Sequence, residues 1–244
     1  MVDLPPLGSL ETRLWDALLD IAQQVPGGWT LIGGQMVLLH GLENERTPHR
    51  ISEDLDLVLD VRVRPPVLRA MVEALERLGF DDAGVSLDGV AHRFVSERVS
   101  VDVLAPDGVG GRADLRTIGG GVTVEVGGGT FALKRTEMIA VSTGARSGSV
   151  PRPDLAGAIL IKAVAARRDR TRGPDRHLRD LAFLLSLATD PLRLRTDLGS
   201  ANCRRVRDVA QLHDRQHEAW RLIGDPQARA DGQATLALVS AGSK

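Results

Sequence analysis

In the stretch Arg50-Ile51-Ser52-Glu53-Asp54-Leu55-Asp56-Leu57-Val58-Leu59-Asp60, two aspartates, Asp54 and Asp56, lie two residues apart inside an apolar run. Such a run favours a buried strand, and alternate side chains of a strand share a face. Both carboxylates then point the same way, roughly 7 Å apart. Because two acids on an apolar strand repel each other and lose solvation, a positive group is expected to compensate. A divalent metal ion held by oxygen ligands is the predicted group.

A third aspartate has the same surroundings. Asp102 lies in Ser100-Val101-Asp102-Val103-Leu104, where apolar residues flank the acid within an expected strand. If the two strands are neighbours, three carboxylates meet on one face, which is the set that holds two divalent ions roughly 3.5–4 Å apart. Such ions bridge nucleotide phosphates and neutralise a leaving pyrophosphate, and the third acid is a candidate base for an attacking hydroxyl. The alternative is that these acids lie at strand ends and are hydrated, and this interpretation is preferred for Asp60.

A glycine pair, Gly33-Gly34, follows the apolar residues 29–32 and precedes a helical pattern. This position exposes backbone N–H groups at a helix N-terminus, where phosphate oxygens bind readily and the missing Cβ permits close approach. A tight turn between strand and helix is the simpler interpretation, and it is compatible with phosphate binding.

The composition is that of a chain with a real core, with 43% apolar and 26% charged residues. One cysteine, Cys203, excludes internal disulfides and a thiolate zinc site. The N-terminus lacks the basic and apolar regions of a signal peptide, and the apolar run 155–161 is far too short to span a bilayer. These features predict a cytoplasmic protein that does not associate with membranes.

Charge is divided unevenly along the chain. Residues 1–150 carry 14 Lys/Arg and 21 Asp/Glu, whereas residues 151–220 carry 14 and 9. An acidic part that holds metal and a basic part that holds an anionic substrate would explain the division, although solvated arginine-rich helices would also do so. Nearly every cation is arginine, and the exceptions are Lys134, Lys162 and Lys244. Because lysine is a compact point charge, its retention at internal positions suggests a tight phosphate site.

The hydrophobic periodicity predicts an α/β (α+β) fold with a C-terminal helical part. Helices are expected at 10–25, 35–41 and 65–78, and strands at 29–32, 55–60, 91–95, 99–104, 122–126 and 139–142. After residues 147–153 the pattern becomes helical, with helices expected at 155–168, 176–188, 202–223 and 228–240. The predicted domains are therefore 1–150, an α/β domain, and 151–244, a helical domain.

Taken together, these motifs resemble the nucleotidyltransferase (DNA polymerase β-like) superfamily. The elements are Gly33-Gly34, then Arg50-x-Ser52-x-Asp54-x-Asp56, then Asp102. Pro153-Asp154-Leu155, Lys162-Ala163-Val164-Ala165 and Arg176-His177-Leu178-Arg179-Asp180-Leu181 further resemble the AbiEii/AbiGii-type toxins, including the mycobacterial MenT group. His177 stands where that family often has Asp, so His177 is left out of the expected site. The resemblance covers roughly residues 30–185 and implies a polymerase-β-like mixed sheet.

The resemblance also implies a role for each matching position. Asp54, Asp56 and Asp102 would bind Mg²⁺ or Mn²⁺, with Asp102 completing the metal site or acting as base. Gly33, Gly34 and Ser52 would contact the phosphates of an NTP. Lys162 would neutralise the triphosphate, and Asp180 would orient Lys162 or the nucleotide, unless the two form only a surface salt bridge. Arg50 would reach a phosphate or pair with Glu53, and Lys134 has no clear counterpart.

The expected function is that of a toxin that transfers NMP from an NTP to an RNA acceptor, the tRNA 3′ end, and so blocks translation. A cognate antitoxin is an expected partner. Arginines of the helical part would hold backbone phosphates, because 3% aromatic residues leave little base stacking; they are Arg167, Arg168, Arg170, Arg172, Arg204, Arg205 and Arg207. Two alternatives remain open. The acceptor is a protein hydroxyl or a small molecule such as an antibiotic, or the chain is a non-catalytic nucleotide- or RNA-binding module.

Overall fold

The computed structural model describes residues 1–64, 66–84, 92–109, 123–168 and 175–241. The chain forms two compact units, one of residues 1–36 and 52–153, the other of residues 37–51 and 154–244. The second unit therefore takes a short segment from the N-terminal half as well as the C-terminal residues. The predicted domain boundary at residue 150 stays a prediction.

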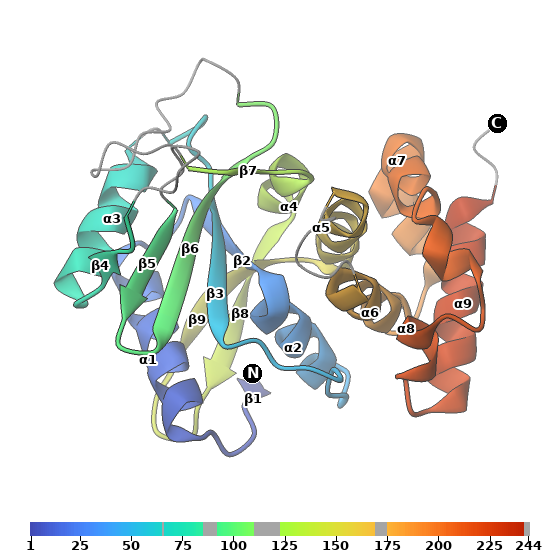
Figure 1. Ribbon diagram of the computed structural model, residues 1–244, viewed down its shortest axis with the longest axis horizontal. Coiled ribbons are helices and arrows are strands. Elements are labelled where there is room, and N and C mark those ends of the chain that lie inside the picture. Colours follow the sequence, from blue (N-terminus) through green and yellow to red (C-terminus); the bar gives the residue numbers. More distant parts are fainter. Residues whose placement is uncertain (65, 85–91, 110–122, 169–174, 242–244) are drawn as a thin grey trace. The chain divides into compact units, whose positions relative to one another are not determined.

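The first unit is built on a mixed sheet in the strand order β2-β3-β6-β5-β4, with β7 paired to β6 (Figure 1). β3 and β6 run parallel, whereas β2 is antiparallel to β3, and β5 is antiparallel to both β6 and β4. The strands are β2 (Trp29–Ile32), β3 (Asp54–Leu59), β4 (Asp81–Asp82), β5 (Arg93–Ser96), β6 (Val99–Pro106) and β7 (Glu125–Val126). The predicted mixed α/β fold is confirmed.

β3 lies between β2 and β6 in this sheet, and one of its two faces is fully buried. Leu55, Leu57 and Leu59 are fully buried on one face, while Asp54 and Asp56 alternate with them on the other. Val58 shares the face of the aspartates and is met there by Gly129, the first residue of helix α4 (Gly129–Lys134). The alternation read from the sequence therefore places both carboxylates on one face, as predicted.

A second sheet of the first unit has the order β1-β8-β9. Its strands are β1 (Val2–Asp3), β8 (Thr136–Ser142) and β9 (Ser147–Pro153), and helix α1 (Ser9–Gln24) packs against β9 and also contacts β3 and β6. Helix α3 (Val67–Arg77) contacts α1. The sequence analysis missed β9, because glycine and proline are unfavourable in strands. Backbone pairing with β8 over its whole length nevertheless makes it a strand.

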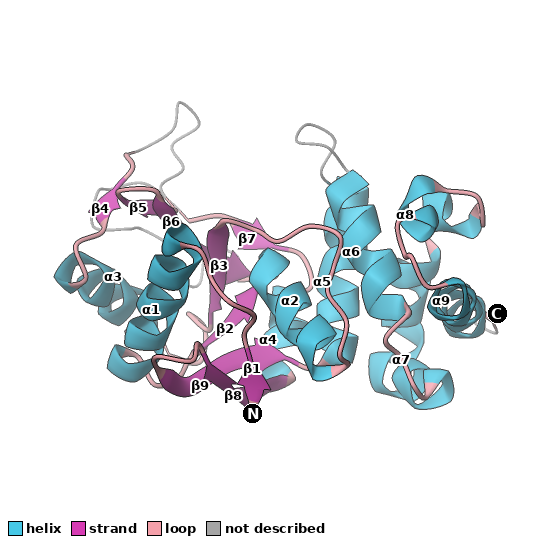
Figure 2. Cartoon of the chain, turned by 90° about the horizontal axis from the view of Figure 1, so that it is seen from below, coloured by secondary structure: helices cyan, strands magenta, loops and turns pink. Residues whose placement is uncertain are grey.

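The second unit is helical. Helix α2 (Gly33–Glu43) contributes its residues from Val37 onward, and helices that follow β9 complete the unit (Figure 2). α5 packs against α6 and α7, and α9 packs against α6 and α7. The helices are α5 (Leu155–Arg168), α6 (Asp175–Leu185), α7 (Pro191–Arg207), the 3₁₀ turn η2 (Ala210–His213), α8 (Glu218–Arg221) and α9 (Pro226–Ser240). The predicted bounds of α5 are confirmed.

The predicted helix over residues 202–223 is wrong. α7 ends at Arg207, and η2 and α8 follow as separate short turns. The fully buried Trp220 donates its indole N–H to the carbonyl of Leu212 at 2.9 Å. In one continuous helix these residues would be about 12 Å apart along the axis, so this hydrogen bond requires the break.

Among the described residues, no helix is long and apolar enough to cross a membrane.

We expect Leu57→Ala to lower the free energy of unfolding by about 2–5 kcal/mol, because it removes a buried side chain from the centre of the first unit. Leu57 is 0% exposed, whereas Leu192 is 63% exposed, so Leu192→Ala is a matched control expected to change stability by less than about 0.5 kcal/mol. Urea unfolding followed by tryptophan fluorescence measures both values. An equal effect of the two substitutions would contradict the assignment of β3 to the core.

Candidate active site

The three predicted acids lie on adjacent parallel strands. In the register of β3 and β6, Asp56 is paired with Asp102 and Asp54 with Ser100. Paired residues of neighbouring strands project from the same face, so Asp54, Asp56 and Asp102 share one face of the sheet. Asp54 and Asp56 are half-buried, and Asp102 is 7% exposed. The strands are thus neighbours, as the sequence analysis required.

Arg93 supplies a positive charge to this row that the sequence analysis did not anticipate. Its guanidinium donates two hydrogen bonds to Asp102, one to each carboxylate oxygen, both at 2.7 Å. These hydrogen bonds raise the pKa of Arg93, partial burial opposes them, and the negative charges of Asp102, Asp54 and Asp56 add to the rise. His92 Nε2 also lies 4.0 Å from an oxygen of Asp102. Arg93 therefore neutralises the most buried of the three acids.

This pairing bears on the predicted metal site. Asp54 and Asp56 offer hard oxygen donors on one face, which is the chemistry that a divalent ion such as Mg²⁺ selects. Asp102 has both oxygens engaged by Arg93. Within the ranges that the structure describes, no group of three or more His, Cys, Asp or Glu is arranged to hold a metal ion. The two aspartates of β3 fit a metal, while a metal-binding role of Asp102 stays a prediction.

The glycine pair at the start of α2 makes room for the side chains of the motif. Gly33 has φ +74°, and a Cβ built there would lie 2.8 Å from Cγ of Asp56. A Cβ at Gly34 would lie 3.0 Å from the hydroxyl oxygen of Ser52. The Ser52 hydroxyl in turn donates to Asp54. Glycine is thus required at both positions for the motif residues to approach the helix start, and contact with phosphates stays a prediction.

Gln35 fixes the turn that carries Ser52. Its side-chain amide donates to the backbone carbonyl of Ser52 at 2.5 Å, and Gln35 is 1% exposed. This hydrogen bond ties the first turn of α2 to Ser52, two residues before β3 begins. Backbone N–H groups at the start of α2 and the carboxylates of β3 are therefore held together within the first unit.

Lys162 and Asp180 form a buried ion pair in the second unit. Nζ of Lys162 on α5 lies 2.6 Å from Oδ2 of Asp180 on α6, and Lys162 is only 4% exposed. A buried ammonium needs such a partner. The pair is thus not the surface salt bridge considered as an alternative, and its role in nucleotide binding stays a prediction.

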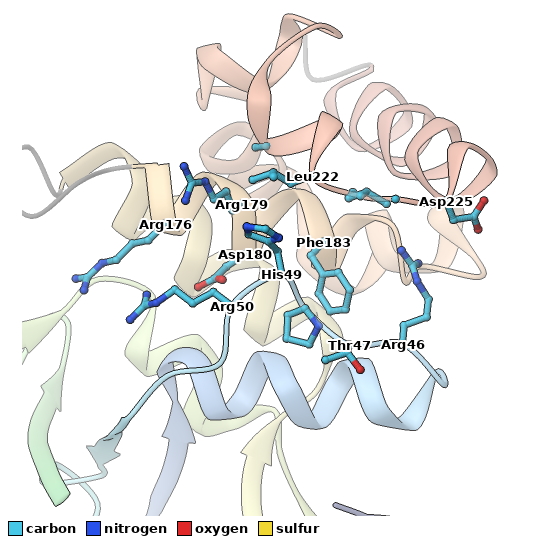
Figure 3. A pocket seen from close by; sticks show the side chains of 14 residues that line it. Arg46, Thr47, His49, Arg50, Arg176, Arg179, Asp180, Phe183, Leu222 and Asp225 are labelled. Atoms are coloured by element: carbon cyan, nitrogen blue, oxygen red, sulfur yellow. The ribbon is translucent and has the colours of Figure 1, made fainter. Parts of the chain in front are cut away.

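The remaining predicted cations lie mostly at the surface. Arg50 is exposed and lines a cavity in the second unit together with Asp180 (Figure 3). Lys134, at the end of α4, is exposed, as are Arg167 and Arg168 at the end of α5. Arg204 and Arg205 are exposed and Arg207 is half-buried, while Arg170 and Arg172 lie outside the described residues.

Arg93 and Gln35 are the site residues that sequence reasoning missed. For Arg93 a signal existed, because a hairpin that turns at Glu97-Arg98 pairs residue 96 with 99 and therefore 93 with 102. Glu97 in that turn has φ +52°. For Gln35 no local pattern distinguishes a side chain that bonds a backbone carbonyl seventeen residues away.

The family model of the nucleotidyl transferase AbiEii toxin, type IV TA system, matches residues 18–236. The chain therefore belongs to the AbiEii nucleotidyl transferase toxin family, and the resemblance read from its motifs is confirmed. Among solved structures, the chain is similar to an antigenic nucleotidyltransferase-like protein from Paracoccidioides brasiliensis. The match has 19% sequence identity and a TM-score of 0.41 and covers 84% of this chain and 93% of that chain. A search of curated proteins gave no match.

We expect Gly33→Ala to destabilise the protein more than Gly144→Ala, by about 1–3 kcal/mol. Both glycines have positive φ, +74° and +83°, so both substitutions strain the backbone to a similar degree. Only at Gly33 does the added methyl meet a side chain, that of Asp56, since nothing lies within 4 Å at Gly144. Thermal unfolding of the two variants measures the difference, and equal losses would show that Asp56 does not pack against Gly33.

We expect Lys162→Met to lower the free energy of unfolding by about 3 kcal/mol, because it leaves Asp180 charged and without its partner. The double variant Lys162→Met/Asp180→Leu is expected to regain most of this loss, since an apolar pair replaces the buried ions. Urea unfolding measures the free energy of unfolding of both single variants and of the double variant. A double variant as unstable as the sum of both single variants would show that the two residues do not interact.

Proposed function

We propose that the protein is a metal-dependent nucleotidyltransferase toxin that transfers NMP from an NTP to an RNA acceptor, foremost the tRNA 3′ end. Family membership establishes the nucleotidyl transferase class, and a type IV toxin implies an NTP substrate and a cognate antitoxin. The observation that supports the reaction most directly is the row of Asp54 and Asp56 beside the glycine start of α2. Transfer to tRNA in the cytoplasm would block translation.

The residues of the first unit divide the reaction between them. Asp54 and Asp56 would hold Mg²⁺ or Mn²⁺, which when bound neutralises phosphate charge and favours departure of the pyrophosphate. The backbone N–H groups of Gly33 and Gly34 would bind phosphate oxygens at the start of α2, and the Ser52 hydroxyl would do so after releasing its hydrogen bond to Asp54. Because Gln35 holds the backbone of Ser52, the turn itself would need little reorganisation when the nucleotide binds.

In the transfer step the acceptor hydroxyl oxygen forms a bond to the α-phosphorus, and the bond from that phosphorus to the pyrophosphate oxygen breaks. The hydroxyl proton leaves to a carboxylate of the site or to solvent. Asp102 would accept this proton on a lone pair that its two hydrogen bonds from Arg93 leave free. In the second unit, Lys162 would add positive charge for the triphosphate, with Asp180 holding its ammonium group.

The proposal is tested by incubating the protein with each α-³²P-labelled NTP, Mg²⁺ and total tRNA. We expect label on tRNA, and a loss of at least about 100-fold in Asp54→Asn and Asp56→Asn, which keep the shape but remove the charge. Asp60→Asn is the matched control from the end of the same strand, where the carboxylate accepts a hydrogen bond from Val63 N at 3.3 Å.

Wild-type turnover by Asp56→Asn would contradict the site. Label on protein in place of tRNA would show that the acceptor is a protein hydroxyl. Label on a small molecule alone would show that the acceptor is a small molecule. Nucleotide binding without any transfer would support a binding module.

A further inference from the structure

One row of side chains across three strands of the first unit carries charges of both signs. In the register of the sheet, Asp102 on β6 is paired with Asp56 on β3 and with Arg93 on β5 (Figure 1). Paired residues of neighbouring strands project from the same face, so Asp102 lies between a like charge and an opposite charge. The row lies wholly within the first unit. Its arrangement therefore determines which positive charge neutralises Asp102.

The backbone of the sheet holds Arg93 opposite Asp102. Besides the pairing of β5 with β6, the carbonyl of Arg93 accepts a hydrogen bond from Ala83 N at 2.9 Å. From this fixed position the guanidinium engages both oxygens of Asp102, each at 2.7 Å, and a bidentate ion pair of this kind is stronger than a single hydrogen bond. The side chain of Asp102 is only 9% exposed. The acid is thus enclosed together with a cation that the protein itself supplies.

The charges of the site balance with a single divalent ion. When ionised, Asp54, Asp56 and Asp102 carry three negative charges and Arg93 carries one positive charge, which leaves two negative charges. Arg93 stays charged, because its pKa is raised chiefly by its hydrogen bonds to Asp102. One divalent ion brings the sum to zero, whereas a second would leave an excess of positive charge in a partly buried site. A second ion at Asp102 would also have to displace the guanidinium or lie beside it, and like charges repel.

We propose that Arg93 takes the place of a second metal ion in this site. It holds Asp102 as a neutralised acid that does not coordinate metal, so that Asp54 and Asp56 bind one divalent ion. The inference rests on the proposed function, which assigns the metal to these two aspartates, and it departs from the three ligands and two ions expected from the sequence. Arg93 is a positioning residue, since it acts through Asp102. An NTP that brings its own ion also brings phosphate charge to match it, so the balance applies to the protein without nucleotide.

The test measures Mn²⁺ binding to the full chain without nucleotide, from the loss of the electron paramagnetic resonance signal of free Mn²⁺. We expect the wild-type protein to bind one ion. Arg93→Gln/Asp102→Asn removes one charge of each sign and leaves two amides that can hydrogen-bond to each other, so the affinity for Mn²⁺ is expected to stay within about 3-fold of wild type. Arg93→Gln alone releases Asp102 to the metal and is expected to tighten Mn²⁺ binding at least about 10-fold.

Arg98→Gln is the matched control, because it removes the same charge from an exposed position in the turn of the same hairpin. Two ions bound by the wild-type protein, or a loss of affinity beyond about 3-fold in the double variant, would overturn the inference and leave the proposed function standing. So would an Arg93→Gln variant that binds Mn²⁺ no more tightly than Arg98→Gln. Asp54→Asn is expected to weaken Mn²⁺ binding at least about 10-fold, and an unchanged affinity there would instead refute the metal site of the proposed function, and this inference with it.

Discussion

The repulsion between carboxylates on neighbouring strands is the constraint on which the site depends. Parallel pairing of β3 with β6 sets Asp56 beside Asp102, and both lie among buried apolar residues. Such an arrangement is stable only where each charge has a partner. The guanidinium of Arg93 neutralises Asp102. The Ser52 hydroxyl donates a hydrogen bond to Asp54. The glycine pair leaves room for Asp56 to approach the start of α2. The pairing of β3 with β6, the turn before α2 and the β5–β6 hairpin that carries Arg93 thus all act on the same cluster of negative charges.

In the second unit, too, a buried charge has a partner of opposite sign. Lys162 is buried within an apolar helix and is neutralised by Asp180 from the next helix. Arg179, on the same helix as Asp180, forms an ion pair of its own with Glu218 at 2.6 Å.

Local pattern predicted much of this fold and of the acid row. β2 and α5 have the predicted bounds, and the alternation of Asp54 and Asp56 with leucines sufficed to place both carboxylates on one face. β9 was not predicted, because backbone pairing with β8 outweighs the unfavourable glycine and proline residues. The break after α7 was not predicted, because it depends on the hydrogen bond from the Trp220 indole to the carbonyl of Leu212. The cavity of the second unit could not be predicted, since its walls come from segments more than a hundred residues apart.

The most direct test of the account is a crystal structure of the protein with Mn²⁺ and a non-hydrolysable NTP analogue, with the metal located by its anomalous scattering. The account predicts a metal peak in contact with the carboxylates of both Asp54 and Asp56, with phosphate oxygens at the N-terminal turn of α2. Metal and phosphates bound elsewhere, with these two carboxylates contacting neither, would contradict it.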